Sequence, residues 1–146
     1  MRHATALVLV ALVVTCKNST KPPEPWVGIW HLESVDSVAT PADVTINGYA
    51  SRVVLRTLDV WSGGVGIWTD SMLSASVCGL HAPPGSMCNA SGSSLFSWTT
   101  LGDTLKFVRT AGTSIGYVAN FKTFVRQTDG SLLKTDDNQT EVYRRR

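Results

Sequence analysis

The chain has 146 residues, of which 43% are hydrophobic and 16% are charged, and its net charge is +2. This length allows one domain, and this composition excludes a disordered chain. The small net charge gives no electrostatic reason to expect nucleic-acid binding, and the one basic cluster, residues 144–146, is interpreted as a solvated chain end.

Residues 1–15 have the form of a secretory signal peptide. Arg2 gives a positive start, and residues 4–14 are apolar except for Thr5. A helix needs about 20 apolar residues to span a bilayer, so this run is too short for a stable anchor. We expect residues 1–15 to be removed, which lowers the net charge to +1 because Arg2 leaves with them.

Residues 12–16, Leu-Val-Val-Thr-Cys, resemble the bacterial lipobox. The resemblance implies that Cys16 carries acyl chains such as palmitate and holds the protein on a membrane, since two or more chains anchor stably. Thr15 departs from the pattern, which has Gly, Ala or Ser there, and an ordinary secreted protein is the alternative. Lys17 follows the cysteine, and by similarity to sorting in double-membrane bacteria this implies the outer membrane of the cell envelope.

Residues 16–25 contain three prolines and several small polar residues, which predicts an extended tether. Residues 26–146 then form one domain. Its glycines, tryptophans and many Ser, Thr and Val residues favour an all-β fold. Eight strands are expected at about residues 28–35, 52–60, 65–73, 94–99, 104–109, 117–126, 132–134 and 140–144.

Two longer connections interrupt the strands. Residues 36–48 contain turn signals, and a short helical turn within residues 37–49 is an open alternative. Residues 74–93 are expected to form a long loop. The short turns elsewhere predict an antiparallel up-and-down meander, whose first and last strands would leave free edges unless they pair with each other. We therefore expect a closed eight-stranded barrel, whose interior is filled by side chains or holds one small ligand.

Gly28-Ile29-Trp30, placed at the start of the first strand, resembles the Gly-x-Trp signature of lipocalin-like barrels. The resemblance implies that Trp30 plugs one end of the barrel and that an arginine of the last strand lies over its ring. Arg144 is the candidate for this arginine. The alternative is that Arg144 points to water.

Cys78 and Cys88 lie ten positions apart, and in an oxidising compartment we expect them to form a disulfide. A metal site built from Cys78, His81 and Cys88 is the alternative, but it lacks an obvious fourth ligand. We expect no metal and no cofactor. Only His31 and His81 would remain as histidines after maturation, and no serine lies in a Gly-x-Ser-x-Gly motif, so we expect no enzymatic activity.

Strand alternation suggests an apolar inner face that could bind a small hydrophobic molecule. The candidate ligand-binding residues are Leu55, Ile67, Leu95, Phe107 and Phe121. A barrel packed solid is the alternative. Trp68 and Trp98 fall on the opposite strand faces, where exposed aromatic rings could mark a partner surface.

These features predict an envelope lipoprotein with a lipocalin-like barrel that binds a small hydrophobic ligand. Two alternatives stay open. One is a protein-binding barrel, because similar small barrels with one disulfide occur among bacterial metalloprotease inhibitors, which act through their N-terminal segment. The other is a purely structural envelope protein.

Overall fold

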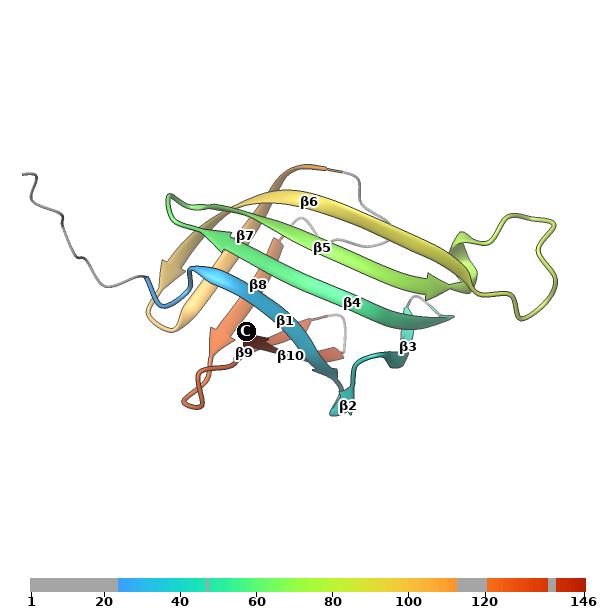
Figure 1. The fold of residues 1–146 in the computed structure, drawn as a ribbon, viewed down its shortest axis with the longest axis horizontal. Coiled ribbons are helices and arrows are strands. Elements are labelled where there is room, and N and C mark those ends of the chain that lie inside the picture. The colour runs from blue at the N-terminus through green and yellow to red at the C-terminus, as the bar shows by residue number, and fades with distance from the viewer. Residues whose placement is uncertain (1–23, 47, 113–120, 137–138) are drawn as a thin grey trace, which may run out of the picture.

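The computed structural model describes residues 24–46, 48–112, 121–136 and 139–146, and within them the protein is all-β. Eight antiparallel strands form a closed barrel (Figure 1). They are β1 (Gly28–Val35), β4 (Tyr49–Trp61), β5 (Val65–Ser74), β6 (Cys88–Leu101), β7 (Thr104–Gly112), β8 (Phe121–Arg126), β9 (Leu132–Asp136) and β10 (Gln139–Arg145). Two short strands, β2 (Val38–Ala39) and β3 (Ala42–Ile46), lie between β1 and β4, and a 3-10 turn, η1 (Ala75–Val77), follows β5. No helix in these ranges is long and apolar enough to cross a membrane.

The first strand closes the barrel. β1 pairs with β10, where Trp30 lies opposite Arg145, and it also pairs with β4, where Gly28 lies opposite Val60. Figure 1 shows β1 lying against both strands. Because β1 bridges β4 and β10, the expected free edges of the meander are joined. The predicted antiparallel barrel and its closure are confirmed.

Two segments that were expected to be connections contain strands. β3 pairs with an extension of β4, from Ala42 opposite Val53 to Ile46 opposite Tyr49, so the described part of residues 36–48 is extended and not helical. β6 begins at Cys88, which shortens the expected loop of residues 74–93 to residues 75–87. Small polar residues dominate the start of β6, and their weak intrinsic preference for strands is overridden by pairing with β5.

Some expected features lie outside the described residues. These are the signal peptide, Cys16, the tether up to residue 23, and residues 117–120 of the strand expected at 117–126. The remainder of that strand is β8.

Aromatic side chains fill much of the barrel. Trp68 of β5, Phe124 of β8 and Tyr143 of β10 are buried together, with ring centroids 5.5–6.1 Å apart. Phe107 of β7 stacks on Phe96 of β6 at a centroid distance of 4.0 Å. Such ring pairs stabilise a core beyond the area that they bury.

Trp30 is buried at the end of the barrel where β1 begins. Its Nε1 donates a hydrogen bond of 2.9 Å to the backbone oxygen of Trp26, and the guanidinium of Arg145 lies 5.0 Å over its ring. Gly28 makes room for this arginine, because a Cβ at Gly28 would lie 3.0 Å from Arg145 Nε. The close approach of Arg145 therefore explains why the Gly-x-Trp motif has a glycine at position 28.

The arginine expected over Trp30 was misassigned by one position. Arg144 is exposed and forms ion pairs with Glu33 at 2.6 Å and with Asp129 at 3.1 Å. Tyr143 and Arg145 share the inner face of β10, and side chains alternate along a strand, so Arg144 must point outward.

Candidate functional site

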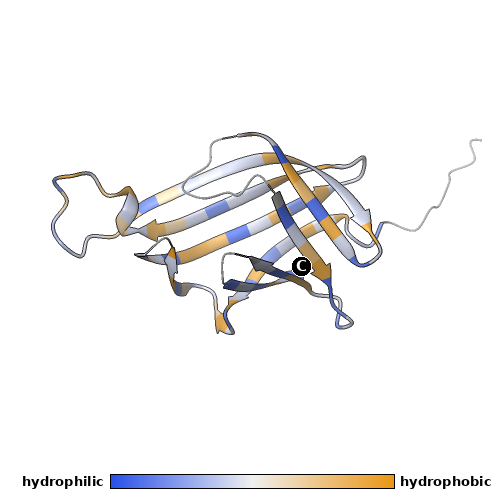
Figure 2. Ribbon diagram, turned by 180° about the vertical axis from the view of Figure 1, so that it is seen from behind, coloured by the Kyte–Doolittle hydropathy of each residue, from blue (hydrophilic) through white to orange (hydrophobic). Residues whose placement is uncertain are grey.

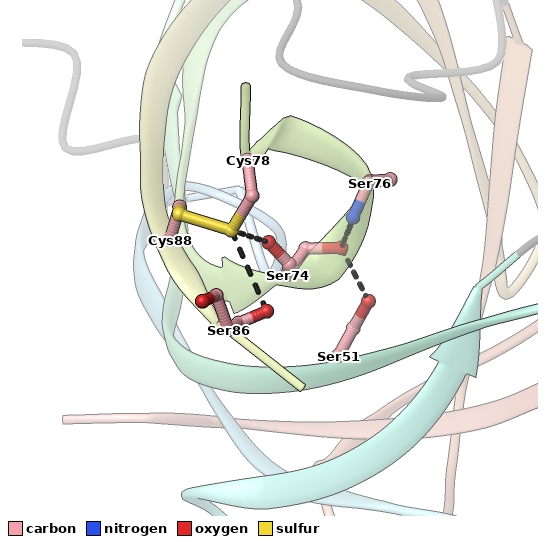
Figure 3. The surroundings of a disulfide bond; sticks show 6 residues. All are labelled: Ser51, Ser74, Ser76, Cys78, Ser86 and Cys88. Carbon is pink, nitrogen blue, oxygen red and sulfur yellow. Dashed lines mark hydrogen bonds between the residues drawn. A yellow bond between two sulfur atoms is a disulfide. The ribbon is translucent and has the colours of Figure 1, made fainter. Parts of the chain in front are cut away.

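A disulfide between Cys78 and Cys88 fixes the loop at one end of the barrel (Figure 3). The prediction of this bond is confirmed. Beside it, the hydroxyl of Ser74 lies 2.8 Å from that of Ser51 and 2.9 Å from that of Ser76. These hydroxyl contacts link β4 to the start of the loop that follows β5. The Cys78 sulfur lies within 3.6 Å of two backbone oxygens, but a disulfide sulfur carries no hydrogen to donate.

The disulfide also excludes the alternative in which these two cysteines bind a metal ion. A metal site at Cys78, His81 and Cys88 would need both thiolates, and the bond uses both sulfurs. Across the part of the chain that the structure describes, no three His, Cys, Asp or Glu side chains are grouped to hold a metal ion.

A hollow of about 840 Å³ opens at the same end of the barrel. It lies among the end of β1, the short strands β2 and β3, and the starts of β4 and β10. Its lining residues are Val35, Asp36, Val38, Asp43, Val44, Thr45, Ala50, Ser51, Met87 and Gln139. Half of these residues are apolar and half are polar, and the polar ones include Asp36 and Asp43.

A buried cluster of charged side chains lies inside the barrel. Arg56 of β4 donates two hydrogen bonds to the carboxylate of Asp70 on β5, at 3.2 and 2.9 Å, and one to Glu141 Oε1 on β10, at 2.6 Å. Lys134 of β9 donates to the same Glu141 oxygen at 3.0 Å. Figure 2 shows hydrophilic positions interrupting the hydrophobic ones along the barrel strands. The expectation of an apolar inner face was therefore wrong.

Glu141 is the centre of this cluster and is 1% exposed. Besides Arg56 and Lys134, it accepts a 2.5 Å hydrogen bond from the hydroxyl of Tyr143. Burial alone would raise the pKa of Glu141, but the charges of Arg56 and Lys134 and the Tyr143 hydrogen bond bring the pKa below its ordinary value. Burial and the neighbouring Glu141 carboxylate raise the pKa of Tyr143 well above its ordinary value.

The pKa of Arg56 follows from the same balance. Burial lowers it, but the carboxylates of Glu141 and Asp70 more than offset burial and raise the pKa above its ordinary value. Both shifts favour the charged forms, so Arg56 and Glu141 form a buried ion pair.

Trp68 lies directly beside this cluster. The guanidinium of Arg56 is 5.3 Å from its ring centre, and Lys122 Nζ is 4.8 Å from it. The side chain is 3% exposed, and its Nε1 finds no acceptor among the residues that the structure describes. A buried donor without an acceptor costs about 1–3 kcal/mol, so this N–H needs an explanation.

The strand register places the cluster beneath the hollow. Val35 lines the hollow and stands opposite Glu141 in the pairing of β1 with β10. Ser51 also lines it, and Ser51 stands opposite Ser74, whereas Arg56 stands opposite Asp70 further along the same strand pair. The charged groups therefore lie between the hollow and the aromatic core.

The expected ligand-binding face was wrong at three positions. Leu55 and Leu95 are 45% and 43% exposed on the outside of the barrel, and Ile67 is directly opposite Leu95 on that outer face. Phe107 does lie inside, in the aromatic core. Phe121 belongs to β8, but its side chain lies outside what the structure describes.

The expectation that Trp68 and Trp98 are exposed was also wrong, because both are buried. Trp98 Nε1 donates hydrogen bonds to the backbone oxygens of Trp61 and Val65, at 3.1 and 3.0 Å. Trp98 therefore serves to fix the turn between β4 and β5 and presents no partner surface.

The charged cluster was missed from the sequence, although alternation carried a signal for it. Lys122 lies two positions from Phe124, and Asp70 lies two positions from Trp68. Once an aromatic residue is assigned to the inner face, the charged residue two positions away must share that face.

Comparison of the chain with protein-family models, curated proteins and solved structures found no match.

Proposed function

We propose that this protein is a lipid-anchored envelope protein whose lipocalin-like barrel binds a small hydrophobic molecule. The observation that carries this proposal is the hollow of about 840 Å³ at the open end of the closed barrel. Val35, Val38, Val44 and Met87 contribute apolar surface to it, beside polar groups that include Asp36 and Asp43. The buried charged cluster beneath it would meet a polar group of the ligand.

The charged cluster supports a binding role for a physical reason. A buried ion pair or triad can often be replaced by apolar residues of similar volume with no loss of stability, or with a gain. A barrel that had only to be stable could therefore fill the space of Arg56, Asp70 and Glu141 with apolar side chains.

Native mass spectrometry of the protein extracted from membranes tests the proposal. We expect a bound small molecule in the natural protein. Val44→Trp should fill the hollow and remove that molecule, whereas Val108→Trp, on the exposed outer face of β7, should keep it. An empty natural protein, or equal occupancy in both variants, would contradict ligand binding in the hollow.

The membrane anchor is a separate part of the proposal, supported by the lipobox resemblance around Cys16. Cells fed with labelled palmitate should incorporate it into the natural protein and not into Cys16→Ser. The acylated protein should fractionate with the outer membrane. Labelling of Cys16→Ser equal to that of the natural protein would rule out this attachment site.

A protein-binding barrel is the second candidate. The disulfide-closed loop of residues 75–87 has no Asp, Glu, Lys or Arg, and Leu80 in it is 102% exposed. An exposed apolar residue on a stapled loop is a suitable anchor for a protein partner. A co-purifying protein that is lost in Leu80→Ser would favour this function over ligand binding, and an empty monomer would favour a structural role.

A further inference from the structure

An apolar patch covers the outer face of the barrel where β5 begins. Strand pairing places Trp61 opposite Val65 and Ile67 opposite Leu95, and Val65 and Ile67 lie two positions apart on one face of β5. Directly opposed side chains of a sheet lie about 4.5–5.5 Å apart, so these four residues, here called the outer patch, are contiguous. Trp61, Val65 and Leu95 are 39%, 44% and 43% exposed.

Polar residues bound the outer patch toward the other end of the barrel. Thr57, Thr69 and Ser93 form the next row of the outer face, and the hydroxyls of Thr69 and Ser93 lie 3.5 Å apart. Asp59 stands opposite Ile67 and adds a carboxylate at the edge of the patch. An exposed apolar patch with a polar rim is typical of a surface that contacts a protein or a membrane.

The first described residues lie at the same end of the barrel as the outer patch. Glu24 and Pro25 border a second hollow, whose other walls include Gly63 in the β4–β5 turn and Thr99 near the end of β6. Figure 1 shows this end, where β1 and β5 begin, opposite the disulfide-closed loop. Glu24 follows Cys16 by eight residues, and an extended chain of that length spans at most about 26–29 Å. An acylated Cys16 would therefore hold the outer patch close to the lipid.

We propose that the barrel docks on the membrane surface through the outer patch, with Trp61 in the interfacial layer of the bilayer. This inference rests on the proposed lipid anchor and names the surface of the barrel that meets the lipid. Tryptophan suits this layer, because its ring is apolar and its N–H can bond to headgroups or water. Asp59 keeps the docking shallow, because a carboxylate is costly in the hydrocarbon layer.

The tether makes such a docking favourable. A linked site meets its partner at a high effective concentration, so a small apolar patch can hold the membrane once the acyl chains are inserted. Docking at this end directs the loop of residues 75–87 and the hollow beside it away from the lipid. A small molecule or a protein partner then reaches that end of the barrel from the aqueous side.

Spin labelling of the full acylated protein in vesicles of phosphatidylethanolamine and phosphatidylglycerol tests the docking. A nitroxide is attached at Leu95→Cys or, as the matched control, at Leu55→Cys. The two leucines are 43% and 45% exposed, and Leu55 lies on the outer face of β4 beyond the polar row. Relative to the unacylated Cys16→Ser protein in solution, the label at position 95 should gain access to oxygen and lose access to a water-soluble nickel complex. The label at position 55 should change in neither.

A charged substitution gives a second readout. Val65→Asp should return the label at position 95 to water, because a carboxylate within the outer patch opposes contact with lipid. Leu55→Asp is the matched control and should leave the label in the lipid. Val65 and Leu55 are 44% and 45% exposed, so neither substitution buries a charge, and urea unfolding checks that both variants stay folded.

The outcomes separate the docking from the anchor. A label at position 95 that stays in water while Cys16 is acylated would overturn the docking and leave the lipid anchor standing. Protection of this label from both oxygen and the nickel complex would mean that a protein, such as a second copy of the chain, covers the patch, and would also overturn it. If mass spectrometry finds Cys16 without acyl chains in cells, the anchor fails and the docking fails with it.

Discussion

Replacing Glu141 by glutamine should destabilise the barrel strongly. Glu141 is 1% exposed and accepts hydrogen bonds from Arg56, Lys134 and Tyr143. Each hydrogen bond from a charged donor contributes about 1.5–3 kcal/mol, and two of the three donors are cations. Removing one partner of a buried pair also leaves uncompensated charge, at a cost of about 3–5 kcal/mol. We therefore expect Glu141→Gln to lower the free energy of unfolding by about 3–5 kcal/mol.

Urea unfolding of the disulfide-bonded protein at neutral pH measures this change. Glu33→Gln is the matched control, because Glu33 pairs with Arg144 at 2.6 Å but both side chains are about half exposed. Exposed pairs contribute about 0–1 kcal/mol, so the control should change stability little. Equal effects of the two substitutions would refute the buried charged network.

Three further predictions concern stability. Gly66→Ala should lower the free energy of unfolding by about 1–3 kcal/mol or more, because the added Cβ would lie 2.4 Å from a backbone oxygen of β4. Gly79→Ala is the control and should be nearly neutral, because the space around Gly79 is open. Thermal unfolding compares the two variants, and equal melting temperatures would contradict the packing. Replacing Cys78 and Cys88 together by serine should lower the free energy of unfolding by about 2–3 kcal/mol in urea, and an unchanged midpoint would count against a structural disulfide. Folding lowers the pKa of Glu141, so the stability that its carboxylate contributes is present above the unfolded pKa, near 4.5, and is lost as the pH falls below that value. Unfolding measured against pH should show this loss of stability in the natural protein and a smaller loss in Glu141→Gln. Identical pH profiles of the two proteins would argue against the lowered pKa.

The sequence was sufficient for the barrel but not for its inner face. Closure could be predicted because Trp30 and the last strand marked the two ends of the meander. On β4 the alternation breaks at a bulge between Val53 and Leu55, so Val53 and Arg56 face inward and Leu55 faces outward. A bulge depends on the partner strand, and the sequence of one strand does not reveal it.

A second ambiguity came from neighbouring apolar residues. Ile67 and Trp68 are adjacent, as are Leu95 and Phe96, so either member of each pair could face the core on hydrophobicity alone. The barrel takes the larger aromatic residue inside in both cases. Choosing the other member also hid the charged cluster, because Asp70 shares the face of Trp68.

A crystal structure of the protein with dodecanoate is the most direct test of the account. It should show the acyl chain in the hollow, in contact with Val35, Val38, Val44 and Met87. Dodecanoate bound only on the outer face of the barrel, with the hollow empty, would contradict ligand binding in the hollow.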